Sequence, residues 1–238
     1  MIEIIHLFKK LEDQMVLTDV NLKIALGEIL VVLGGSGAGK SVLLQHLIGL
    51  MKPDRGSIMI DSKDITRLKE RELLQMRKNI GFLFQEGALY DFMNVFENIA
   101  FPLQEHTTMN ESGIRAKVKE ALKIVGLEGA DEKFPSELSG GMKKRAALAR
   151  AIILDSKILF CDEPTSGLDP ILSKDITDLI QNISRQLKCT TIITSHDMKN
   201  ALRIADRVAI VFKGAILATG TQKDILSSQN AYVREFLN

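Results

Sequence analysis

Two glycine-rich segments of the chain contain the residue types that bind phosphate. The first, residues 34–41, reads GGSGAGKS and fits the pattern G-x-x-x-x-G-K-[ST]. The second begins at Leu138 with LSGGM and continues into the basic run KKR. A single nucleotide needs only one such loop, so the second segment must have another role or serve another molecule.

The surroundings of the first segment favour a phosphate loop over a plain flexible turn. An apolar run at 29–33 precedes it and a helical pattern at 41–50 follows, so the loop joins a strand to a helix. Glycines let consecutive backbone N–H groups surround phosphate oxygens, and a helix N-terminus favours negative charge. We expect Lys40 to contact the β- and γ-phosphates and the Ser41 hydroxyl to ligate Mg²⁺. The residues predicted to hold the nucleotide here are Gly34, Gly35, Ser36, Gly37, Ala38, Gly39, Lys40, Ser41 and Val42.

Two carboxylates follow a second apolar run. Residues 158–161 read ILFC, and Asp162 and Glu163 come next. A carboxylate in the position of Asp162 suits Mg²⁺ coordination through water. Glu163 suits a base that orients an attacking water. Acidic residues often end strands as plain turn residues, but beside a phosphate loop the pair favours nucleotide hydrolysis.

The elements that must position these residues alternate between strand and helix patterns. This alternation predicts an α/β fold with a largely parallel sheet. The expected strands of that sheet are 29–33, 80–84, 157–162, 190–195 and 208–212. Residues 58–62, together with the N-terminal runs, predict a small antiparallel β portion, whereas 95–154 has mainly helical patterns, at 114–125 and 139–153.

With these features in order, the chain resembles the nucleotide-binding subunits of ABC transporters over nearly its whole length. Six motifs carry the resemblance: the phosphate loop, Gln85 after a strand, LSGG, the Asp162–Glu163 pair, SGLD at 166–169, and His196 after 190–195. The resemblance implies a P-loop NTPase (RecA-like) core with a mainly parallel sheet and a small antiparallel β portion. The core is expected at 1–94 and 155–238, with an inserted α-helical subdomain at 95–154 that carries the LSGG signature.

The resemblance also implies a role for the second glycine segment. In this family the signature of one copy faces the phosphate loop of another, and two ATP molecules lie between the two copies. Ser139 and the amides of Gly140 and Gly141 are then expected to bind the γ-phosphate of the partner's ATP. Ser139 as a plain helix N-cap is the alternative, and both roles are compatible.

Other positions acquire roles from the resemblance alone. Gln85 is expected to ligate Mg²⁺ and sense the γ-phosphate, and Asp169 to cross the dimer interface. His196 is expected to contact the γ-phosphate and hold both the attacking water and Glu163. Where the family usually has an aromatic residue that stacks on adenine, this chain has Leu11, so an aliphatic contact is expected there.

A narrower resemblance is to the ATPases of Mla-type (MCE-associated) phospholipid transporters. Met142 stands where the family signature usually has glutamine. The stretch after Gln85 is apolar, which suits the groove that receives a coupling helix of the membrane permease. The alternative for each of its side chains is packing within the helical subdomain. The apolar residues are Ala88, Leu89, Tyr90, Phe92, Met93, Val95 and Phe96.

The resemblance predicts three partners: a second copy of this chain, an integral-membrane permease and an MCE-type lipid-binding protein. The formal net charge of +1 gives no reason to expect nucleic acid as a partner. The two cysteines fit a reduced compartment, with Cys161 read as a core residue. No apolar run approaches the roughly 18 residues of a membrane span, and the N-terminus lacks the order of a signal peptide. We therefore expect a peripheral protein on the cytoplasmic face of the inner membrane.

Three other functions stay open at this stage. The chain could serve an ABC transporter with a different substrate, or act as a soluble ABC-type ATPase on nucleic acid or ribosomes. A small-molecule kinase with a phosphate loop is the third, but it leaves the signature, Asp169 and His196 unexplained. Co-purification with a multispanning membrane protein would separate the transporter functions from the other two. At the C-terminus, Val233, Phe236 and Leu237 are expected to form a small apolar patch.

Overall fold

A computed structural model describes residues 1–237, with side chains up to residue 235. The side chains of Phe236 and Leu237 therefore lie outside the described part, whereas Val233 is fully buried. Contacts divide the chain into two units, Met1–Arg77 with Thr190–Asn238 and Lys78–Cys189. Each unit is described by itself.

The first unit contains an antiparallel sheet with the strand order β2-β1-β4-β5. Its strands are β1 (Ile2–Leu11), β2 (Gln14–Ile24), β4 (Arg55–Ile60) and β5 (Lys63–Asp64). Apolar side chains of β1 and β2, such as Ile2, Ile4 and Leu22, are buried, as expected for strands with one face on the core. The sequence predicted this antiparallel portion but not the length of its first two strands.

The first unit also contains the strand that leads into the phosphate loop. β3 (Ile29–Leu33) pairs in parallel with β8 (Thr190–Ser195) and β9 (Arg207–Phe212). β10 (Ala215–Gly220) then pairs antiparallel with β9. All five residues of β3 are buried, the pattern of a parallel strand covered on both faces. The predicted runs at 29–33 and 190–195 match β3 and β8.

Five helices accompany these strands in the first unit. They are α1 (Lys40–Leu47), α2 (Glu70–Arg77), α7 (Met198–Ile204), α8 (Gln222–Leu226) and α9 (Ala231–Leu237), with a 3₁₀ turn at Ile65–Arg67. α1 is shorter than the predicted 41–50, because Gly49 adopts a positive φ of 68° just after it. Arg77 closes that end by donating to the carbonyls of Ile48 and Gly49 at 3.0 and 2.8 Å.

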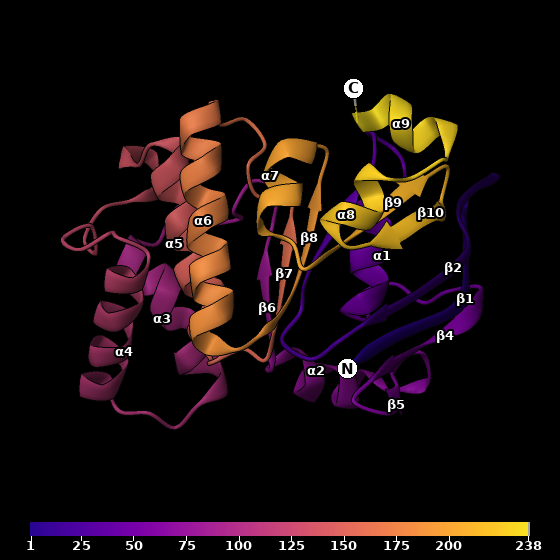
Figure 1. The fold of residues 1–238 in the computed structure, drawn as a ribbon. Coiled ribbons are helices and arrows are strands. Elements are labelled where there is room, and N and C mark those ends of the chain that lie inside the picture. The colour runs from indigo at the N-terminus through magenta and orange to yellow at the C-terminus, as the bar shows by residue number, and fades with distance from the viewer. Residues whose placement is uncertain (238) are drawn as a thin grey trace. The chain divides into compact units, whose positions relative to one another are not determined.

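The second unit combines two parallel strands with four helices. β6 (Ile80–Leu83) pairs with β7 (Ile158–Asp162). β7 ends at the predicted site residue Asp162, and β6 ends two residues before Gln85. The helices are α3 (Val95–His106), α4 (Glu111–Ile124), α5 (Gly140–Ile152) and α6 (Pro170–Leu187), with a 3₁₀ turn at Pro135–Glu137. α3, α4 and α5 pack against one another, and α5 also packs on β6 (Figure 1).

Polar caps fix where the helices of the second unit begin. Asn94 and Glu97 form a capping box at the start of α3, and Asn110 caps α4. α4 therefore starts at Glu111, three residues before the predicted 114. Within residues 1–237, no helix is both long enough and apolar enough to cross a membrane. The division into a core and a subdomain at 95–154 stays a prediction.

Candidate functional site

The phosphate loop connects β3 to α1 in the first unit. The Gly34 N–H donates to the Ser195 carbonyl at 3.3 Å, and the Ala38 carbonyl accepts from the Gly214 N–H at 3.1 Å. The Lys40 ammonium donates to the carbonyls of Gly34 and Gly35 at 2.9 and 3.0 Å. Lys40 is only 6% exposed, so the loop is wrapped around its one positive charge.

Gly39 shows why this loop needs glycine. Its φ is 101°, and a Cβ atom at this position would lie 2.8 Å from the Val16 carbonyl of β2. Gly39 is also the N-cap of α1 and has no side chain with which to cap the helix. Bound phosphate oxygens can therefore accept hydrogen bonds from this helix start.

Two further predicted residues belong to the first unit. His196 follows Ser195 and is exposed, and Ser195 is the register partner of Leu33, which precedes Gly34. The ends of two paired parallel strands therefore bring His196 to the start of the phosphate loop. Leu11 ends β1 opposite Gln14 and is half-buried, and its contact with a base stays a prediction.

The second unit carries the carboxylates at the end of β7. Glu163 has a positive φ of 44°, a backbone conformation that costs free energy for a residue other than glycine. Its side chain is 9% exposed. Its carbonyl accepts from the Ser166 N–H at 3.1 Å, and the Ser166 hydroxyl accepts from the Gln85 amide at 3.3 Å. Gln85 and the turn after Asp162 are thus brought together. A strained backbone of this kind is typical of a functional position.

The second glycine segment forms the start of α5. The Ser139 hydroxyl caps the helix by accepting from the Met142 N–H at 3.3 Å, as expected. A Cβ at Gly140 would meet Leu168 at 3.5 Å and one at Gly141 would meet Leu172 at 3.6 Å, both ordinary contacts. Within the described residues, a Cβ at either position would therefore meet no close contact. Glycine weakens a helix by roughly 0.5–1 kcal/mol, so the pair fits the close approach of a group from outside the chain.

Asp169 follows Leu168, whose side chain lies near this helix start. It caps α6 by accepting from the N–H groups of Ile171 and Leu172 at 2.9 and 3.0 Å. The side chain of Ile171 is 75% exposed, which is unusual for isoleucine. Its exposure was not predicted from the sequence. The one sequence signal for this exposed residue is its place directly after the cap Asp169 and Pro170, in the first turn of the helix.

The residues predicted to hold Mg²⁺ are Ser41, Gln85 and Asp162. They offer hydroxyl, amide and carboxylate oxygens, the hard donors that Mg²⁺ prefers. Ser41 belongs to the first unit and the other two to the second. Among residues 1–237 no three His, Cys, Asp or Glu side chains gather into a metal site. This donor set fits an ion that is bound together with nucleotide phosphates.

The apolar segment after Gln85 is held by a fully buried asparagine. The Asn98 side chain accepts from the Tyr90 N–H at 2.8 Å and donates to the carbonyls of Tyr90, Met93 and Asn94 at 3.0–3.1 Å. Phe92 is 75% exposed, and its ring lies 5.7 Å from that of Tyr90. A firmly held segment therefore presents aromatic rings to its surroundings.

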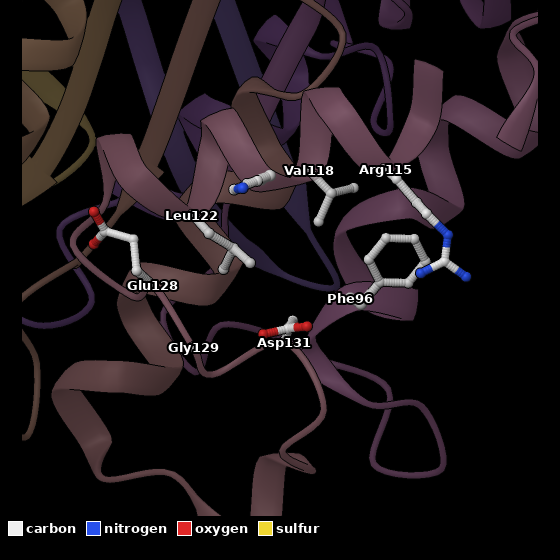
Figure 2. Close-up of a pocket in the computed structure, with 8 residues that line it drawn as sticks. Phe96, Arg115, Val118, Leu122, Glu128, Gly129 and Asp131 are labelled. Carbon is white, nitrogen blue, oxygen red and sulfur yellow. The ribbon is translucent and has the colours of Figure 1, made fainter. Parts of the chain in front are cut away.

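Two members of the predicted apolar groove lie elsewhere. Val95 is fully buried in the core, which corrects its assignment to the groove. Phe96 is half-buried under the Arg115 guanidinium, 5.3 Å away, and lines a pocket of about 340 Å³ shown in Figure 2. The other residues around this pocket are Arg115, Val118, Lys119, Leu122, Glu128, Gly129 and Asp131. None of them is a predicted nucleotide ligand.

A sequence profile described as ABC transporter matches residues 17–166. The chain is 46% identical over 237 residues to the probable ribonucleotide transport ATP-binding protein mkl of Mycobacterium leprae, of which it covers 68%. It is 44% identical to the intermembrane phospholipid transport system ATP-binding protein MlaF of Haemophilus influenzae, of which it covers 90%. It is also 40% identical to the methionine import ATP-binding protein MetN of Campylobacter jejuni, of which it covers 75%. In each of these three comparisons the whole chain is matched.

One solved structure with a similar fold is the dimeric post-hydrolysis state of the ATP-binding cassette MJ0796 bound to ADP and Pi. Its TM-score is 0.85 at 30% sequence identity, and the match covers 93% of this chain and 99% of that one. The likeness extends over almost the whole chain and confirms the predicted α/β fold.

Replacing Glu163 tests its role as the base. Glu163→Gln keeps the size of the side chain but removes the proton acceptor. We expect the variant to bind ATP normally and to hydrolyse it about 10²- to 10⁴-fold more slowly. Phosphate release and the binding of a fluorescent ATP analogue measure the two properties. Glu120→Gln, an exposed change on α4, is the control, and wild-type turnover by Glu163→Gln would rule out the base assignment.

Replacing Gly140 tests the requirement for glycine at the start of α5. Gly140→Ala should keep the free energy of unfolding or raise it by up to about 1 kcal/mol, because alanine favours a helix. ATPase activity should fall by about tenfold or more, because the methyl group obstructs phosphate from a second copy. Glu120→Ala, an exposed change on α4, is the control. Unfolding in urea and ATPase assays measure both effects, and an active, equally stable Gly140→Ala would contradict the trans role.

Proposed function

Because the chain belongs to the ABC transporter family of ATP-binding proteins, we propose that it energises a membrane permease that moves phospholipids. The chain binds ATP and hydrolyses it to drive transport. The observation that carries the phospholipid proposal is the 44% identity to MlaF of Haemophilus influenzae across 90% of that protein. Met142, at the signature position where glutamine is usual, supports the same assignment.

Hydrolysis depends more on positioning and charge than on covalent chemistry. The Lys40 ammonium, already held at the loop carbonyls, is placed to meet the β- and γ-phosphates. Glu163 orients and deprotonates the water, and His196 holds that water in place. Ser41, Gln85 and Asp162 would hold Mg²⁺, which supplies positive charge for the phosphate oxygens. Leu11 offers the base an aliphatic surface instead of an aromatic ring.

The second glycine segment acts on the ATP of another copy. Ser139 caps the start of α5. Within the described residues, a Cβ on Gly140 or Gly141 would meet only ordinary contacts. Such a helix start binds anions through its N–H groups and its dipole. Asp169 and the exposed Ile171 lie at the same surface and would contact the partner copy. Each active site is then assembled from the phosphate loop of one copy and the α5 start of the other.

The aromatic surface formed by Tyr90 and Phe92 is the proposed docking site for the permease. An exposed ring pair on a segment fixed by a buried asparagine suits an apolar partner helix. Docking there would place the chain on the cytoplasmic face of the inner membrane. An MCE-type lipid-binding protein is the expected third component of the system.

The names of the relatives leave other transport substrates to be tested. The mkl protein is described as a probable ribonucleotide transporter subunit, and it is about as similar to this chain as MlaF is. The chain spans about two thirds of the length of mkl but 90% of MlaF, which favours the phospholipid assignment.

The permease complex tests both the substrate and the docking surface. The chain is expected to co-purify with a multispanning permease, and the complex in phospholipid vesicles should move a fluorescent phospholipid when ATP is added. Phe92→Ser should keep the ATP affinity of the isolated chain but lose the permease, because an exposed apolar contact is removed. Lys123→Met, an exposed change on α4, should have no effect. Transport of ribonucleotides or methionine in place of phospholipid, or an intact complex with Phe92→Ser, would contradict the proposal.

A further inference from the structure

One side of α5 holds the segment that follows β6. The Lys144 ammonium donates to the Gln85 carbonyl, and the Arg150 guanidinium donates to the Gly87 carbonyl at 2.9 Å. Between these two contacts, Gly87 has a φ of 79°, and a Cβ there would lie 3.3 Å from the Ala147 Cβ. Two hydrogen bonds therefore fix residues 85–87 to α5, and Gly87 packs closely against that helix.

Both cations of this contact are expensive for the fold. Lys144 is 6% exposed, and burial lowers the pKa of its ammonium, although the exposed Glu86 partly offsets this. Burial also lowers the pKa of the Arg150 guanidinium. Their hydrogen-bond acceptors in this contact are neutral carbonyl oxygens. Burying a cation without a paired negative charge costs free energy, so a role in holding residues 85–87 would explain why cations stand at these two positions.

The segment held by α5 carries two features of the proposed function. On one side the Gln85 amide donates to Ser166, in the turn that follows Asp162 and Glu163. On the other side the segment leads to Tyr90, whose ring lies 5.7 Å from the Arg150 guanidinium. The same helix begins with Ser139. Gln85, Tyr90 and Ser139, which have separate proposed roles, are thus all connected to helix α5.

We propose that Lys144 and Arg150 are positioning residues that act through the main chain of residues 85–87. They hold Gln85 in the orientation that the nucleotide site requires. They also fix the Tyr90–Phe92 surface to the helix that presents Ser139. This inference rests on the proposed role of Gln85 at the nucleotide.

The isolated full-length chain is sufficient for the first test. Lys144→Met removes the donor while keeping a side chain of similar volume. We expect unchanged ATP affinity, about tenfold lower kcat, and faster amide hydrogen exchange across residues 85–93. Lys144→Arg, which keeps a donor, should recover most of kcat and of the exchange protection. Lys123→Met controls for the loss of a lysine on an exposed helix face.

A double mutant tests whether Lys144 acts through Gln85. Gln85→Ala should lower kcat, and adding Lys144→Met should cause no further loss, because both changes disable the same group. Arg150→Met should increase exchange in the same segment. Lys144→Gln, with a shorter neutral donor, serves as a second variant if the methionine variant folds poorly.

The outcomes separate this inference from the proposed function. If Gln85→Ala keeps wild-type kcat, the proposed role of Gln85 fails and the inference is overturned with it. If Gln85→Ala is impaired while Lys144→Met has normal kcat and exchange, only the inference fails. A multiplicative loss in the double mutant, or a fall in ATP affinity equal to the fall in kcat, also overturns it.

Discussion

Backbone N–H groups at a helix start bind anions, and we infer that nucleotide phosphates bind at two glycine-rich helix starts of this chain. At α1, Gly39 has no side chain to cap the helix, and the approach of Val16 excludes any larger residue. At α5, the Ser139 hydroxyl accepts from one N–H group. A Cβ at Gly140 would meet only an ordinary contact within the described residues. Phosphate oxygens suit both positions because they bring negative charge and several acceptors. We infer that the other site residues serve to hold nucleotide phosphates at these two helix starts.

In each unit, the strands and the buried polar contacts position the predicted site residues. In the first unit, parallel pairing of β3 and β8 sets His196 beside the beginning of the phosphate loop. In the second, Gln85 follows the end of β6 and the carboxylates lie at the end of β7, and the Ser166 hydroxyl accepts from the Gln85 amide. The buried Asn98 side chain hydrogen-bonds to the main chain of Tyr90, Met93 and Asn94 and so orders the segment after Gln85. We infer that Lys144 and Arg150 extend this ordering to the α5 helix.

The sequence predicted what depends on local pattern and missed what depends on tertiary contacts. The strands at 29–33 and 190–195 were found because apolar runs bounded by turn residues are clear signals. Ser139 as a helix cap was likewise readable from residue type and position. Val95 was misplaced because an apolar residue at a helix start can face either the core or a partner. The burial of Lys144 and the strained backbone of Glu163 left no local signal, since both arise from packing between distant segments. The ligand roles of the site residues stay predictions.

The central claim is that the helix start of one copy meets the phosphate loop of another. Cross-linking tests it directly, because Ser36 and Ser139 are exposed whereas the native Cys161 and Cys189 are buried. In the Glu163→Gln background, one preparation carries Ser36→Cys and the other Ser139→Cys, and the two are mixed with a short thiol cross-linker. The account predicts a product of twice the chain mass that forms in the mixture, depends on ATP, and is absent from either preparation alone. Failure to form this product, or equal yield without ATP, would contradict the account.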